Sequence, residues 1–267
     1  MNSIEKLIAA EKKNNSILCV GLDIVAEKMP DKLERSIEGM LEFNKAIIES
    51  TSDLVSSYKI NFAFYEQYGK RGYELLENTI AMIPSDIHII ADAKRGDIGN
   101  TSAAYAKAVF EELKCDSITV SPYMGKDSVS PFLDYSDKMV FLLCLTSNSG
   151  SNDFEKEKIG DKYLYEVVLE KSMNWGGTDN LGYVVGATHP EELKNIRDLA
   201  NDRYFLIPGI GAQGGSPDEV MDANGSGPSI INSSRGIIYA GGNEDKYADF
   251  IRLAALELRN QLNEARI

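Results

Sequence analysis

The residues with the clearest chemical potential follow an apolar run near the middle of the chain. After residues 87–91, Asp92 and Asp97 flank Lys94 within six positions. Because side chains alternate between the two faces of a strand, Asp92 and Lys94 should point the same way. The glycines at 96 and 99 should then let the chain turn Asp97 back toward that pair. A cluster of two carboxylates and one ammonium is costly to bury unless its charges neutralise one another. We interpret it as a functional site, with a structural ion-pair network as the alternative.

Two segments near the C-terminal end predict a phosphate site. Residues 209–215 contain four glycines together with Gln213, and Ser234, Arg235 and Gly236 follow one another further on. Glycine lets backbone amides approach an anion closely, and an arginine guanidinium can bind a phosphate with two parallel hydrogen bonds. The alternative is that the glycines only form a turn and that Arg235 is solvated.

Strand and helix patterns alternate along the chain and must position these residues. Apolar runs predict eight strands, at 17–23, 54–61, from 87 onward, 115–120, 139–146, 181–187, 204–208 and 229–233. Amphipathic patterns predict helices from Pro30, over about 64–82, 102–113, 125–135, 161–175 and 190–199, and near the C-terminus. Strands that are apolar on both faces indicate a parallel sheet covered by helices. Since a (β/α)8 barrel takes ~250 residues, residues 1–267 are predicted to form one α/β domain, a TIM barrel.

A barrel of this kind carries its active site at the C-terminal ends of the strands. The predicted strand ends and the loops after them supply Asp23, Lys59, Asn61, Asp92, Lys94, Asp97, Ser147, Asn148, Gln213 and Arg235. The polar side chains therefore fall where the predicted fold would place a site.

Composition excludes several classes of partner. The net charge of −13 disfavours nucleic acids and anionic membranes as partners. Residues 1–6 do not resemble a signal peptide, and no apolar stretch reaches the ~18 residues of a membrane span. Three widely spaced cysteines and two histidines offer no metal-ligand spacing, so we expect buried thiols, no metal and a cytoplasmic protein.

The segment from Asp92 to Thr101 resembles the Asp-x-Lys-x-x-Asp-Ile-x-x-Thr signature of orotidine 5′-phosphate decarboxylases. Three further segments are similar to that family and occur in the same order: Lys59-Ile60-Asn61, Pro208 to Gly215, and Ser234-Arg235-Gly236. The resemblance is greatest to the longer bacterial form and runs from about Val20 to Gly236. Ser149 departs from it, because the family has proline there in a Ser-Asn-Pro-Gly loop.

The resemblance implies that the protein converts orotidine 5′-phosphate into uridine 5′-phosphate (UMP) and CO2 in pyrimidine biosynthesis, with neither cofactor nor metal. Lys94 would protonate C6 of the pyrimidine, and Asp92 would lie against the departing carboxylate. Lys59 would hold Asp92 and the ribose.

The same resemblance implies a homodimer in which Asp97, Ile98 and Thr101 complete the partner's site. The other substrate-binding residues that it implies are Asp23 and Asn61 near the ribose, Ser147 and Asn148 near the pyrimidine, and Pro208, Gln213, Ser234 and Arg235, of which Gln213 and Arg235 bind the phosphate.

Two alternatives remain. A metal-dependent sugar-phosphate decarboxylase or synthase on the same barrel usually has an acid at the end of its second strand. Lys59 occupies that place, and its charge would repel Mg²⁺. A non-catalytic phosphate-binding barrel could keep Gln213 and Arg235 while losing Asp92 or Lys94, and this chain has both.

Overall fold

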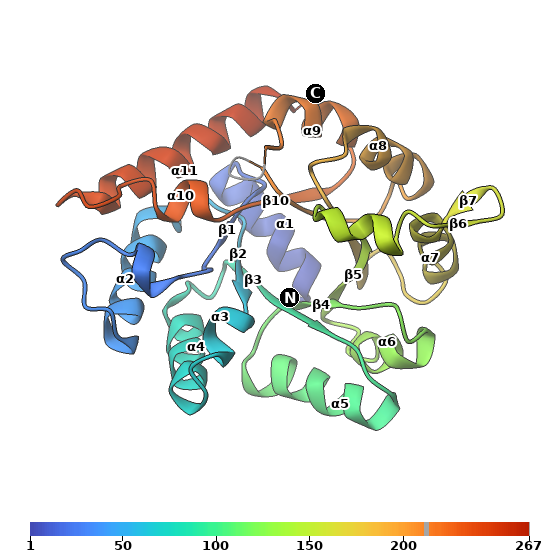
Figure 1. Ribbon diagram of the computed structural model, residues 1–267, viewed down its shortest axis with the longest axis horizontal. Coiled ribbons are helices and arrows are strands. Elements are labelled where there is room, and N and C mark those ends of the chain that lie inside the picture. The colour runs from blue at the N-terminus through green and yellow to red at the C-terminus, as the bar shows by residue number, and fades with distance from the viewer. Residues whose placement is uncertain (211–213, 267) are drawn as a thin grey trace.

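Eight parallel strands close into a barrel surrounded by helices (Figure 1). The computed structural model describes residues 1–210 and 214–266. Around the barrel the strands follow the order β1-β10-β9-β8-β5-β4-β3-β2. Their bounds are β1 Leu18–Gly21, β2 Ser57–Asn61, β3 His88–Arg95, β4 Ser117–Val120, β5 Met139–Leu145, β8 Leu181–Val185, β9 Phe205–Pro208 and β10 Ser229–Ser233. Each strand overlaps a predicted one, so the predicted TIM barrel is confirmed.

Most of the helices pack outside the barrel and shield the outer faces of the strands (Figure 1). Their bounds are α1 Ser3–Asn14, α2 Ile37–Thr51, α3 Ala63–Glu66, α4 Lys70–Met82, α5 Gly99–Lys107, α6 Lys126–Leu133, α7 Leu164–Ser172, α8 Pro190–Leu199, α9 Pro217–Asn224, α10 Arg235–Ile238 and α11 Tyr247–Glu264. Shorter elements are the 3-10 turns Ala26–Lys28 and Ser149–Asp153, a π-helical turn at Ala108–Glu112, and the strands β6 Lys158–Ile159 and β7 Lys162–Tyr163. Within the described residues, no helix has both the length and the apolar character needed to cross a bilayer.

Helix α1, which the sequence patterns did not predict, covers the N-terminal end of the barrel. Its Leu7 is fully buried and belongs to the same cluster as the inward-facing Ile90 and Phe141. The His88 ring lies 3.1 Å from the Ser3 carbonyl oxygen of α1. Burial lowers the pKa of His88 to about 4, so the imidazole is neutral and structural. Helix α1 therefore closes the interior of the barrel at its N-terminal end.

The predicted helix start at Pro30 is wrong. Helix α2 begins at Ile37, with Ser36 as its N-cap, and the Ser36 hydroxyl accepts a hydrogen bond from the Gly39 amide at 3.2 Å. The preceding residues form a loop in which the Arg35 guanidinium donates to the Pro30 carbonyl at 2.8 Å. A serine that can cap a helix outweighed the proline as the start signal.

Two other predicted helices differ because glycines with positive φ interrupt them. The helix predicted over 64–82 is divided into α3 and α4 at Gly69, whose φ is +59°. The helix predicted from 161 begins at Leu164 instead, because β6 and β7 form an antiparallel hairpin that turns at Gly160, with φ +66°. Residues with a Cβ rarely adopt this backbone region.

The three cysteines are free and buried, as predicted. Burial raises the pKa of the Cys19 and Cys115 thiols to about 12. Both thiols therefore stay protonated near neutral pH, and neither is poised to act as a nucleophile.

Candidate active site

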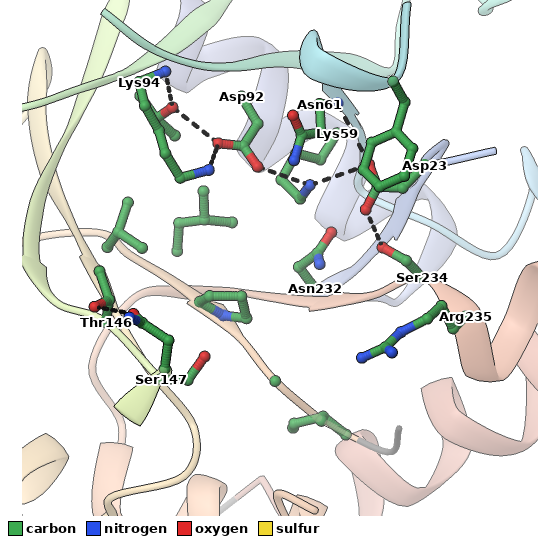
Figure 2. A pocket seen from close by; sticks show the side chains of 18 of the residues that line it. Asp23, Lys59, Asn61, Asp92, Lys94, Thr146, Ser147, Asn232, Ser234 and Arg235 are labelled. Atoms are coloured by element: carbon green, nitrogen blue, oxygen red, sulfur yellow. Dashed lines mark hydrogen bonds and ion pairs between the residues drawn. The ribbon is translucent and has the colours of Figure 1, made fainter. Parts of the chain in front are cut away.

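A cavity of about 510 Å³ opens at the C-terminal ends of the strands. Ten of the residues that the sequence assigned to a site line it: Asp23, Lys59, Asn61, Asp92, Lys94, Ser147, Asn148, Pro208, Ser234 and Arg235. They come from β1, β2, β3, β5, β9 and β10 or from the loops that follow these strands, and Figure 2 shows most of them around one space. Gln213 lies outside the described residues.

Charged side chains form an alternating chain along one wall of the cavity (Figure 2). The Lys59 Nζ lies 3.5 Å from Asp23 Oδ1 and 3.0 Å from Asp92 Oδ2. The Lys94 Nζ lies 2.6 Å from Asp92 Oδ1. Lys59 is 4% exposed, whereas nearly half of the Lys94 side chain is accessible from the cavity. Asp92 thus holds one structural ammonium and one that can reach a ligand.

The protonation of the buried members follows from two opposing effects. Burial alone would raise the pKa of Asp92, but the Lys59 and Lys94 ammonium groups outweigh it and hold the pKa well below the usual range of a carboxyl. Burial would likewise lower the pKa of Lys59, but the carboxylates of Asp23 and Asp92 raise it above its usual value. Asp92 is therefore a carboxylate and Lys59 an ammonium throughout the neutral range.

Lys94 reaches the cavity through a distortion of β3. Between the pairs Ala91–Ile118 and Arg95–Val120, β3 contains three residues and β4 only one. The φ of Lys94 is +45°, in the left-handed region. The prediction that Asp92 and Lys94 share a face is confirmed by their ion pair, but simple alternation along a regular strand is not the cause. A bulge of this kind redirects a side chain, often beside an active site.

Asp23 connects the charged wall to the last strand of the barrel. Its Oδ2 accepts a hydrogen bond from the Ser234 hydroxyl at 2.8 Å, and its Oδ1 accepts one from the backbone N–H of Asn61 at 3.3 Å. The Asn61 side chain accepts from the Ala63 amide at 3.2 Å, at the start of α3. These hydrogen bonds fix the positions of Asp23, Asn61 and Ser234 relative to one another, and so connect the C-terminal ends of β1, β2 and β10.

The opposite end of the cavity carries a guanidinium group. Arg235, at the start of α10, is exposed and points into the space (Figure 2). Pro208 ends β9, and Gly209 follows with φ +113°, a conformation that brings backbone close to the cavity without a side chain. A guanidinium together with exposed backbone amides can bind a phosphate.

The loop after β5 is held by a contact that the sequence did not reveal. The Thr146 amide donates to the Glu155 carboxylate at 2.7 Å, and the Thr146 hydroxyl lies 2.6 Å from Asn148 Oδ1. Ser149 stands where proline was expected and begins the 3-10 turn that ends at Asp153. Glu155 therefore fixes the loop that presents Ser147 and Asn148 to the cavity.

Three predicted site residues, Asp97, Ile98 and Thr101, do not line this cavity. Asp97 was expected to turn back toward Asp92 and Lys94, but no ion pair joins it to Lys94 among the described residues. Its backbone is instead fastened to Ser102, whose hydroxyl donates to the Asp97 carbonyl at 2.7 Å. The expected return of Asp97 within its own chain is therefore wrong, because the chain enters α5 directly.

Several cavity residues escaped the sequence reasoning. Thr119 on β4 and Asn232 on β10 are polar and buried, and both line the cavity. Leu143, Val184 and Leu206 add an apolar wall. A polar residue near the end of an apolar strand was the available signal for the first two residues.

No cluster of three or more metal-binding side chains occurs in residues 1–210 and 214–266. Lys59 occupies the space between two of the cavity's carboxylates, as the distances above show. A divalent cation at that position would have to displace an ammonium that both acids already neutralise.

Comparison with known proteins places the chain among proteins of one kind. The model of the orotidine 5′-phosphate decarboxylase / HUMPS family matches residues 16–250. This chain is 49% identical to the orotidine 5′-phosphate decarboxylase of Dehalococcoides mccartyi strain BAV1, and 49% identical to that of Bacteroides fragilis strain YCH46. The first alignment covers 100% of this chain and 99% of the relative, and the second covers 95% and 94%. The solved structure of Leishmania donovani OMP decarboxylase superimposes with a TM-score of 0.87 and 40% identity, covering 100% of this chain and 99% of that one.

The two lysines that bind Asp92 should differ in their effect on stability. Lys59→Met leaves the buried carboxylate of Asp92 and the partly buried carboxylate of Asp23 without their shared cation, and should lower the free energy of unfolding by about 3–5 kcal/mol. Lys94→Met leaves Asp92 bound to Lys59, and should change that free energy by less than about 1 kcal/mol because Lys94 is half exposed. Urea unfolding of ligand-free protein measures both values. Equal losses in the two variants would contradict this division of roles.

Proposed function

The chain belongs to the orotidine 5′-phosphate decarboxylase / HUMPS family, and we propose that it converts orotidine 5′-phosphate into UMP and CO2 in pyrimidine biosynthesis. The protein is a carboxy-lyase, and the whole chain serves as one barrel domain in the cytoplasm. The observation that carries the proposal is the acid–ammonium chain Asp23–Lys59–Asp92–Lys94 on one wall of a cavity whose far end presents Arg235. The acid–ammonium chain can act on the reacting carbon, and Arg235 can bind the phosphate.

Lys94 acts at C6 of the pyrimidine. When the bond from C6 to the carboxylate breaks, its electron pair stays on C6 and CO2 leaves. The Lys94 ammonium, held by Asp92 at 2.6 Å, stabilises that developing charge electrostatically. Lys94 then transfers a proton to C6, and the resulting neutral amine regains a proton from water.

Asp92 orients Lys94 and faces the carboxylate of the substrate. With its pKa held low, Asp92 is ionised when the substrate binds, so the two carboxylates repel each other. Loss of CO2 relieves that repulsion while the attraction of Asp92 to Lys94 is kept. Lys59 holds Asp92 from the other side and lies beside the ribose.

The rest of the cavity positions the substrate. Asp23, Asn61 and Ser234 contact the ribose, and the pyrimidine edge meets Ser147 and Asn148. Arg235, Pro208 and Gln213 bind the phosphate. Because the phosphate is remote from C6, its binding energy can hold the pyrimidine against Lys94 without taking part in bond breaking.

We further propose that the protein is a homodimer in which Asp97, Ile98 and Thr101 complete the partner's site. Asp97 is absent from its own cavity, and Ile98 is 57% exposed. The loop before α5 adjoins the loop before α6, since a Cβ on Gly96 would lie 3.1 Å from the Ser121 carbonyl. Tyr123, in that second loop, is 84% exposed. Such an uncovered apolar surface supports contact with a second copy.

Purified protein should turn over orotidine 5′-phosphate in buffer that contains a chelator. The change from orotate-type to uracil-type ultraviolet absorbance follows the reaction. Absence of turnover, or turnover that requires added metal, would favour one of the two alternative functions.

Removal of the proton donor should abolish catalysis without unfolding the barrel. Lys94→Ala should lower kcat by at least ~10³-fold, since both charge stabilisation and proton transfer are lost. Lys194→Ala, which removes an exposed lysine on α8, is the matched control and should keep wild-type activity. An active Lys94→Ala enzyme would mean that the proton comes from another group.

Shared sites predict complementation between inactive chains. Lys94→Ala and Asp97→Ala homodimers should each be inactive, but mixing them with subunit exchange should restore part of the activity. In a mixed dimer, one of the two sites receives both an intact Lys94 and an intact Asp97. A mixture that stays inactive, although native mass spectrometry detects the mixed dimer, would refute the shared site.

A further inference from the structure

Thr119 lies between the two groups that the proposed reaction uses most directly. It stands on β4, opposite the distorted end of β3, and is 1% exposed. Its Oγ1 lies 3.0 Å from the backbone nitrogen of Lys94 and 3.0 Å from Asp92 Oδ1. One hydroxyl therefore contacts both the backbone of the proton donor and the carboxylate that orients it.

The chemistry of the partners fixes the direction of these hydrogen bonds. A backbone amide can only donate, so Lys94 N–H donates to the Thr119 hydroxyl oxygen. The ionised Asp92 can only accept, so the single hydroxyl proton of Thr119 goes to Asp92 Oδ1. That oxygen also receives the Lys94 ammonium at 2.6 Å, while Oδ2 receives Lys59 at 3.0 Å. Both oxygens of Asp92 are thus held from fixed directions.

The bulge in β3 explains why the two hydrogen bonds of Thr119, which together clamp Lys94 and Asp92, are needed. Thr119 is the single β4 residue opposite three residues of β3, the last of which is Lys94. A left-handed backbone is unfavourable for a residue with a Cβ, and Lys94 has φ +45°. The backbone amide of Lys94 donates to the Thr119 side chain at 3.0 Å. Without this hydrogen bond, the left-handed backbone of Lys94 would lose a contact that stabilises it.

We propose that Thr119 is a positioning residue for the decarboxylation, acting through Lys94 and Asp92 rather than on the substrate. Its hydroxyl keeps Lys94 in the left-handed conformation and keeps Asp92 turned toward the Lys94 ammonium. This inference rests on the proposed function of the site. Displacement of a catalytic group by about 1 Å can reduce a rate by 10²-fold, so loss of the clamp should reduce kcat far more than it weakens binding.

Two substitutions separate the hydroxyl from the shape of the side chain. Thr119→Val keeps the branched shape and removes both hydrogen bonds. It should lower kcat by about 10- to 100-fold and change KM less than about twofold, because the phosphate and ribose contacts remain. Thr119→Ser keeps the hydroxyl and should retain most of the wild-type kcat. A Thr119→Ser enzyme as slow as Thr119→Val would show that the methyl group matters, and would overturn the inference.

A double substitution tests whether Thr119 acts through Lys94. In the Lys94→Ala background, Thr119→Val should cause little further loss of the residual kcat, because the proton donor that Thr119 positions directly and through Asp92 is gone. A further loss as large as in the wild-type background would contradict the inference. Binding of UMP to Thr119→Val, measured by titration calorimetry, should match the wild type.

Controls keep the outcomes distinct. Circular dichroism verifies that Thr119→Val is folded, and Thr119→Ala provides a second variant without a hydroxyl if it is not. Failure of the wild-type protein to turn over orotidine 5′-phosphate would refute the proposed function itself. Wild-type turnover with an undiminished kcat in a folded hydroxyl-free variant would refute only the role of Thr119.

Discussion

The ammonium of Lys59, buried between Asp23 and Asp92, is the interaction on which the site depends. Removing three charges from water is unfavourable unless each finds an opposite partner at short range. Here the contacts are 3.0 and 3.5 Å and join β1, β2 and β3 at their C-terminal ends. The Ser234 hydroxyl extends the frame to β10 through Asp23, across the closure of the barrel between its first and last strands. The position of Asp92, and through it the position of Lys94, is therefore set by the closed barrel rather than by a flexible loop.

Lys94 has a strained backbone and a side chain that is accessible from the cavity. Its backbone has φ +45°, while its ammonium remains half exposed and bound to a single carboxylate. Local strain persists where surrounding contacts over-determine it, and such places are frequent at functional sites. The same carboxylate that neutralises Lys59 in the interior presents Lys94 to the cavity. One aspartate thus links the stability of the fold to the chemistry, which accounts for the different effects expected from its two lysine partners.

The sequence predicted the barrel and many of the residues that line the candidate site, because both follow from local patterns. Apolar runs marked the strands, and polar residues at their ends converge once parallel strands close. The segment after Asp92 could not be predicted fully, because the backbone of the β3 bulge is hydrogen-bonded to Thr119, which is 25 residues away along the chain. The helix start at Ile37 depended on which of two competing signals, Pro30 or Ser36, would prevail. The predicted return of Asp97 was wrong for the chain itself because Ser102 holds the Asp97 backbone, and the Ser102 hydroxyl also lies 2.8 Å from the Ser128 carbonyl of α6.

The most direct test of the central claim is a crystal structure of the protein with UMP bound. The account predicts that the Lys94 Nζ lies within hydrogen-bonding distance of the C6 edge of the pyrimidine, with Asp92 behind it. The phosphate should contact Arg235 at the far end of the cavity. A complex with the phosphate against Lys94, or with C6 facing the apolar wall of Leu143, Val184 and Leu206, would contradict it.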